Sequence, residues 1–86
     1  MAEYNIEFVD SAAKEFRALP IDIKHRVQSA VDSLHNNPFP PRVRKLTGHK
    51  SLYRIRIGQY RIVYEIDAEQ KVIRVTRIRH RREVYR

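Results

Sequence analysis

The chain has 86 residues, of which 42% are hydrophobic and 33% charged, a composition that excludes a disordered tail and predicts one small domain over residues 1–86. It contains no cysteine, which excludes disulfides and cysteine-ligated metal sites and makes the cytoplasm the expected location. The net charge of +8 predicts a polyanionic partner, and the lack of an apolar run of about 18 residues argues against a membrane span or a signal peptide.

The first part of the chain predicts one strand followed by two helices. Residues 4–9 alternate between apolar and polar side chains, as in a half-buried strand. A short helix follows, with Asp10 or Ser11 as its cap and Pro20 as its end. A second helix opens at Pro20, and its apolar stripe consists of Ile23, Val27, Ala30, Val31 and Leu34. We expect the two helices to form a hairpin that covers a sheet.

The last part predicts three antiparallel strands. The alternating segments are residues 52–57, 60–66 and 72–78, and the turns between them fall at residues 58–59 and 67–70. The expected fold is therefore α+β, with an N-terminal strand, a helix hairpin and a three-stranded antiparallel meander.

The positive charge is confined to the second half of the chain. Residues 1–41 carry four Lys or Arg and six Asp or Glu, a net charge of −2. Residues 42–86 carry fourteen Lys or Arg and four Asp or Glu, a net charge of +10. This asymmetry favours a localised basic face over a charge spread for solubility.

The Gly58-Gln59 pair is typical of a two-residue type II′ turn, which fixes the register of the first hairpin. Arg56 then lies opposite Arg61, a like-charge pair that costs about 0.2–1 kcal/mol of stability. Arg54 shares their face, and three guanidiniums on one face favour a phosphodiester ligand. The opposite, core-facing side is expected to carry Tyr53, Ile55, Ile57, Tyr60, Ile62, Tyr64, Ile73 and Val75. Arg74 is expected to meet Glu65 diagonally.

The C-terminal segment, residues 77–86, holds five Arg and one Glu. It can be a solvated basic end, or it can return beside the three arginines with His80, Arg81 and Tyr85. The His80 imidazole can donate or accept a proton, and the Tyr85 ring can either anchor the end of the chain or stack on an RNA base. None of the four histidines has a partner at metal-ligand spacing.

Four segments together resemble the RelE branch of the RelE/ParE toxin superfamily. They are Leu46-Thr47-Gly48, Tyr53-Arg54-Ile55-Arg56-Ile57, Tyr60-Arg61-Ile62-Val63-Tyr64-Glu65 and His80-Arg81-Arg82-Glu83-Val84-Tyr85. The resemblance covers essentially the whole chain. It implies a toxin of a type II toxin–antitoxin pair that inhibits translation as a ribosome-dependent mRNA endoribonuclease (an mRNA interferase). Such an enzyme cuts mRNA in the ribosomal A site by attack of the ribose 2′-OH, needs no metal or cofactor, and is silenced by a RelB-type antitoxin.

The resemblance also assigns roles to residues. It matches Arg54 and Arg56 to two basic residues of the family's site, Arg61 and Arg81 to phosphate-binding arginines, and Tyr85 to a tyrosine near the end of the chain. We expect Arg61 and Arg81 to stabilise the pentacovalent phosphate, and Arg54 and Arg56 to orient it. Some family members have lysine at the first two positions, and an arginine is a poor base because it stays protonated, so proton transfer is expected to involve His80 or Tyr85. Two further expected phosphate-binding residues are Lys45 and Arg79.

Two alternatives remain at this point. One is a ParE-like toxin that acts on DNA gyrase with the same fold. Against it speaks the set of Arg54, Arg56, Arg61, Arg81 and Tyr85. The other is a non-catalytic RNA-binding module, which would use the same basic face without cleaving.

Overall fold

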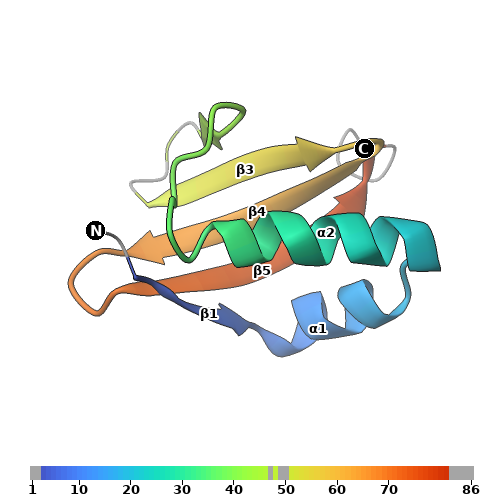
Figure 1. Cartoon of the computed structure of the whole chain (residues 1–86), viewed down its shortest axis with the longest axis horizontal. Helices are drawn as coiled ribbons and strands as arrows, with labels where there is room; N and C mark the ends of the chain where they lie inside the picture. Colours follow the sequence, from blue (N-terminus) through green and yellow to red (C-terminus); the bar gives the residue numbers. More distant parts are fainter. Residues whose placement is uncertain (1–2, 47, 49–50, 82–86) are drawn as a thin grey trace.

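A computed structural model describes residues 3–46, 48 and 51–81, which form one sheet with two helices (Figure 1). The elements are β1 (Asn5–Phe8), α1 (Asp10–Arg17), α2 (Ile21–Ser33), β2 (Arg44–Lys45), β3 (Leu52–Ile57), β4 (Tyr60–Asp67) and β5 (Val72–His80). The strand order is β1-β5-β4-β3-β2, with β1 parallel to β5 and the other neighbours antiparallel. The predicted α+β class is confirmed, and the structure adds the short edge strand β2.

The chain leaves the sheet after β1 and forms the two helices α1 and α2. The backbone N–H of Val9 still donates to the carbonyl of Val75 at 3.0 Å, and Val9 is also the N-cap of α1. The prediction that Asp10 or Ser11 caps α1 is therefore wrong: the helix begins one residue earlier, and its cap makes no side-chain hydrogen bond. Pro20 is the N-cap of α2, as its fixed φ near −56° allows. Within the described ranges, no helix has the length and apolar character needed to cross a membrane.

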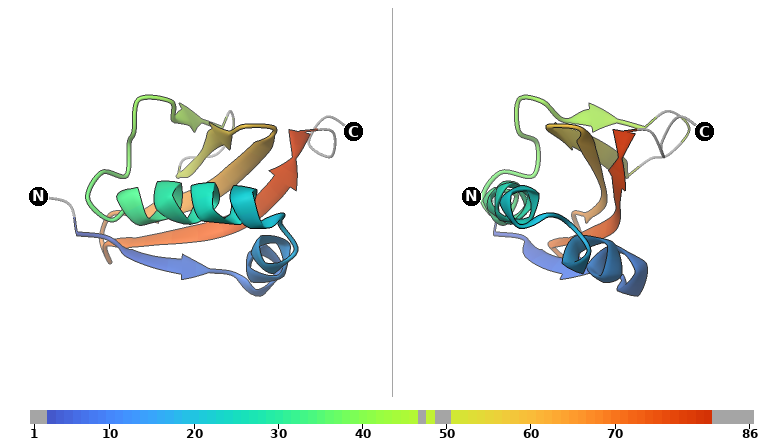
Figure 2. Two further views of the ribbon diagram at one scale, coloured as in Figure 1. Left: turned by 45° about the vertical axis from the view of Figure 1, so that its right-hand side comes forward. Right: turned by 90° about the vertical axis from the view of Figure 1, so that its right-hand side faces the viewer.

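The core lies between α2 and the sheet, and its sheet side is the face predicted from the alternation. Among the fully buried side chains are Val27, Val31, Leu34, Ile62, Tyr64, Ile73 and Val75. The Tyr64 hydroxyl donates to the carbonyl of Pro38 at 3.0 Å, which fastens the proline loop to the centre of the sheet. Figure 2 shows α2 across one face of the sheet, while α1 runs beside β5 beyond the end of β1.

The register of the first hairpin agrees with the prediction, with Arg56 opposite Arg61. Gly58 has a φ of 59°, and among the described non-glycine residues Lys71 is the one with a positive φ, so Gln59 has a negative φ as a type II′ turn requires. The second turn differs from the prediction by one residue. Asp67 is still paired with Val72, and the turn spans residues 68–71, where Lys71 adopts the left-handed conformation.

A β-bulge interrupts the pairing of β4 with β5. Val63 is opposite Arg77, but Tyr64 is opposite Val75, so Thr76 is the extra residue. The Thr76 hydroxyl donates to the carbonyl of Val63 at 3.2 Å. The bulge shifts all later pairs by one position, and it therefore decides which side chains meet across these two strands.

Candidate nucleic-acid interface

Arginines form two rows across the face of the sheet that points away from α2. Directly paired residues of neighbouring strands share a face, so one row joins Arg56, Arg61 and Arg79. The second row joins Arg44, Arg54, Val63 and Arg77. We call this side of the sheet the arginine face.

Arg61 lies at the centre of this face. It is on the middle strand, and it is only 7% exposed. Beside it is a concave space of about 620 Å³, the arginine hollow, lined by residues 41–44 and by Arg54, Arg56 and Arg61. Because the partly buried guanidinium is in a medium of lower dielectric than water, its attraction for an anion in the hollow is strengthened.

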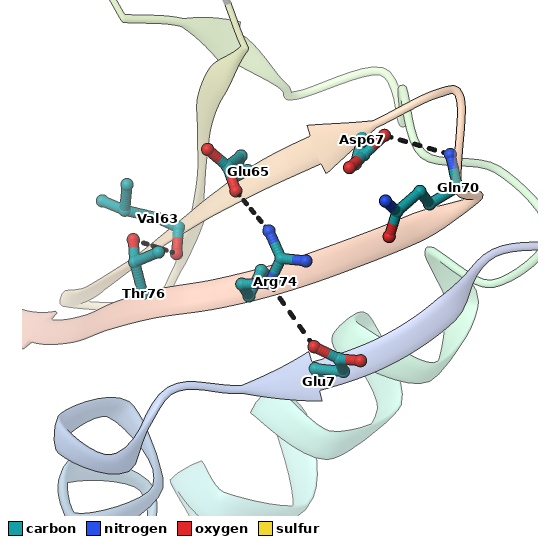
Figure 3. A network of polar contacts seen from close by, with 7 residues as sticks. All are labelled: Glu7, Val63, Glu65, Asp67, Gln70, Arg74 and Thr76. Atoms are coloured by element: carbon teal, nitrogen blue, oxygen red, sulfur yellow. Dashed lines mark hydrogen bonds and ion pairs between the residues drawn. The ribbon is translucent and has the colours of Figure 1, made fainter.

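The other end of the arginine face is neutralised by acids. Arg74 lies opposite Glu65, with 2.6 Å between its Nη1 and the carboxylate, and 3.4 Å separates its Nε from Glu7 on β1 (Figure 3). The hydrogen bond from Arg74 to Glu65, followed by the one to Glu7, raises the pKa of Arg74 further above its usual value. The predicted diagonal contact with Glu65 is thus a direct pair, because the turn between β4 and β5 spans residues 68–71 and not 67–70.

Glu15 of α1 performs a similar role at the edge of β5. One carboxylate oxygen accepts the backbone N–H of Ile78 at 2.7 Å, and the other lies 2.9 Å from Nε of Arg79 and 3.5 Å from Nη1 of Arg77. This N–H belongs to the part of β5 that has no β1 neighbour. The single side chain of Glu15 therefore accepts a hydrogen bond from the edge of β5 and compensates the charge of two arginines.

The remaining predicted site residues are not all on the arginine face. Lys45 is paired with Tyr53 and so lies on the opposite side from Arg54. His80 is paired with Tyr60, and their rings meet edge to face at 5.1 Å, so it too lies on the side of the core. Of the two possibilities for the C-terminal segment, a return of His80 beside the arginines is therefore wrong, because strand β5 continues through residue 80 and fixes the alternation of its side chains.

Arg81 directly follows β5. Its backbone N–H donates to the carbonyl of Gln59 at 2.6 Å, which holds it next to the turn between β3 and β4. Tyr85 lies outside the described residues.

The sequence interpretation missed Arg42 and Arg44, which line the arginine hollow together with Arg54 and Arg56. The sequence carries no clear signal for β2, and only the pairing of β2 with β3 shows that Arg44 shares a face with Arg54. In the part of the chain that the structure describes, no group of three His, Cys, Asp or Glu side chains is placed to hold a metal ion.

Comparison with known proteins gives a consistent family. Residues 6–85 match the family described as ParE toxin of type II toxin-antitoxin system, parDE. The chain is 31% identical to Toxin RelG of Mycobacterium tuberculosis, and the match covers 96% of this chain and 97% of that protein.

Solved structures agree with this family. The archaeal RelE-RelB complex from Pyrococcus horikoshii OT3 matches with a TM-score of 0.82 at 30% identity, covering 92% of this chain and 96% of the other. The isolated Escherichia coli RelE toxin matches with a TM-score of 0.82 at 28% identity, covering 95% of this chain and 90% of the other. The chain is a RelE-type toxin and belongs to the RelE/ParE superfamily of type II toxin–antitoxin systems.

Proposed function

We propose that this toxin is a ribosome-dependent endoribonuclease that cuts mRNA in the A site and thereby stops translation in the cytoplasm. The observation that carries the proposal is the arginine hollow. Arg54, Arg56 and Arg61 come together there from two strands, while Glu7 and Glu65 pair with Arg74 at the other end of the same face. A planar guanidinium that is always charged suits a phosphodiester, which it binds through two parallel hydrogen bonds.

The chemistry proposed for the hollow is transfer of the phosphate to the neighbouring ribose. The 2′-oxygen of the ribose forms a bond to phosphorus, the bond to the 5′-oxygen breaks, and a 2′,3′-cyclic phosphate remains. Negative charge accumulates on the pentacovalent phosphate, and Arg61 and Arg81 would stabilise it while Arg54 and Arg56 orient the strand. Lys45 and Arg79 would contribute to the positive field around the RNA, and neither needs to touch the reacting phosphate.

Two protons must move in this reaction, one from the 2′-OH and one to the leaving 5′-oxygen. Tyr85 and His80 are the proposed carriers, and Tyr85 is favoured because the strand register places His80 on the other face of the sheet. If both His80→Ala and Tyr85→Phe retained full cleavage on ribosomes, this assignment would be wrong.

The proposed partner is a RelB-type antitoxin, since the similar archaeal toxin was solved as a RelE-RelB complex. The net charge of +8 makes a partner with acidic segments physically suitable. Such a segment would occupy or neutralise the arginine face and so compete with mRNA.

The proposal is tested with the purified chain and ribosomes that carry a defined mRNA. The chain should produce a cut within the A-site codon, and Arg61→Gln should slow single-turnover cleavage by at least about 100-fold, as for loss of one group that stabilises a developing charge. Arg17→Gln is the matched control, because it removes the same charge from an exposed position on α1. Binding without cleavage would support an RNA-binding module instead, and inhibition of DNA gyrase would support a ParE-like toxin.

A further inference from the structure

A second concave space adjoins the arginine hollow at the edge of the sheet. It lies between α2 and β3 and measures about 410 Å³, and we call it the α2 hollow. Its polar lining consists of His25, Arg26 and Ser29 from α2, Arg42 from the loop before β2, and Arg56 from β3. The guanidinium of Arg26 leans over the turn between β3 and β4, so that a Cβ on Gly58 would lie 3.3 Å from its Nη1.

The α2 hollow has an excess of positive charge. No Asp or Glu is among the described residues that line it. The salt bridges found among the described residues involve Arg74, Arg77 and Arg79, whereas Arg26 and Arg42 take part in none of them. The acids of these salt bridges thus compensate arginines of β5, and none of them compensates Arg26 or Arg42.

The two hollows are adjacent, because Arg42 and Arg56 line both of them. An anion in one hollow therefore has cations of the other as immediate neighbours. A ligand that fits this arrangement carries negative charges at regular intervals along a flexible chain, as a single RNA strand does. The hydroxyl of Ser29 and the imidazole of His25 offer further hydrogen bonds to phosphate oxygens.

We infer that the α2 hollow binds a second RNA backbone phosphate, next to the one held in the arginine hollow. Arg26 is its principal ligand and Arg42 is shared between the two phosphates. The nature of the ligand rests on the proposed function, but the site itself rests on the geometry and charge of α2 and β3. The phosphate belongs either to the mRNA strand or to ribosomal RNA, and these two sources give different results in the experiment below.

The experiment measures how salt weakens binding of the purified chain to RNA that is 2′-O-methylated and so cannot be cleaved. Each lost phosphate contact to a single strand lowers the slope of log affinity against log salt by about 0.7. Arg26→Gln should therefore reduce the slope by about 0.7 for an octanucleotide, and it should leave the slope for a dinucleotide, with its single phosphate, unchanged. Arg26→Lys should retain the slope, and Arg17→Gln is the charge-matched control that lines neither hollow.

A ribosome-binding measurement with the same variants separates the two sources. If Arg26→Gln weakens binding to the octanucleotide, the second phosphate belongs to the mRNA strand. If it weakens only binding to ribosomes, the phosphate belongs to ribosomal RNA. If Arg26→Gln and Arg42→Gln, with melting curves of folded protein, both bind octanucleotide and ribosomes as the unchanged chain does, the inference is overturned.

Failure of the proposed function would give different results from failure of the second phosphate site. A chain that never cleaves mRNA but shows an Arg26-dependent salt slope would contradict the endoribonuclease and support the second phosphate site. A chain that cleaves in the A site with no contribution from Arg26 or Arg42 would contradict the second site alone.

Discussion

Arg56 on β3 and Arg61 on β4 lie directly opposite each other in the antiparallel ladder, with both side chains on the arginine face. Like charges at directly opposed positions destabilise a sheet. The same sheet pairs Arg74 with Glu65 a few residues away, so opposite charges at facing positions are available to this fold. We interpret the Arg56–Arg61 pair as a feature kept for binding an anion, at the expense of stability.

Arg56→Gln should therefore make the protein more stable and less active. Removing one charge of the pair should raise the free energy of unfolding by about 0.2–1 kcal/mol at low salt, and the gain should shrink at high salt because ions screen the repulsion. Urea unfolding at two salt concentrations measures this effect. Lys45→Gln is the control, since it removes a charge from the neighbouring strand at a position that faces Tyr53. Equal effects of the two substitutions would contradict the interpretation.

Glu15 should contribute more through its hydrogen bond to the backbone of β5 than through its charge. Glu15→Ala leaves the N–H of Ile78 without its acceptor, which should lower the free energy of unfolding by about 1–3 kcal/mol. Glu15→Gln keeps an acceptor oxygen and loses only the attraction to two half-exposed arginines, which is worth at most about 1 kcal/mol. Urea unfolding distinguishes the two variants, and an equal loss for both would show that the charge dominates.

Tyr64 should make the protein sensitive to alkali. Burial of its hydroxyl, with a smaller contribution from Tyr53, raises the pKa of Tyr64 far above its ordinary value of 10.0. The folded protein thus holds this proton more tightly than the unfolded chain does. The contribution of Tyr64 to the free energy of unfolding is therefore complete below about pH 10 and is lost as the pH rises above it. The urea midpoint of the unchanged chain should fall toward that of Tyr64→Phe as the pH is raised from neutral to about pH 11. A constant difference over that range would contradict the expectation.

Gly58 should tolerate a side chain less well than Gly48. Both have a positive φ, 59° and 84°, so an alanine at either position is strained by about 1–2 kcal/mol. Only at Gly58 would the new Cβ also press on the guanidinium of Arg26, whereas nothing lies within 4 Å at Gly48. Gly58→Ala should therefore destabilise at least as much as Gly48→Ala and also weaken RNA binding. Equal RNA affinities of the two variants would show that the position of Arg26 is unimportant.

The sequence predicts the centre of the site because local rules determine it. A two-residue turn at Gly58 and Gln59 leaves one register for β3 and β4, and strict alternation then separates the arginines from the core. The pairing of Arg56 with Arg61 follows from these two rules alone.

The parts of the site that the prediction missed depend on contacts between distant segments. The bulge at Thr76 brings Arg77 opposite Val63 and Arg79 opposite Arg61, and no turn residue signals it. The two residues of β2 are too few to show alternation, which concealed the place of Arg44 beside Arg54. Glu15 reaches β5 from a helix more than sixty residues earlier in the chain, so its role becomes visible only in the folded structure.

The most direct test of the central claim is to map the ends of mRNA in cells that express the chain without an antitoxin. We predict new ends within codons of translated messages, at the position of the A site, and their loss with Arg61→Gln at equal protein level. Arg17→Gln should give the same ends as the unchanged chain. Growth arrest without such ends, and above all arrest accompanied by gyrase-dependent breaks in DNA, would contradict the account.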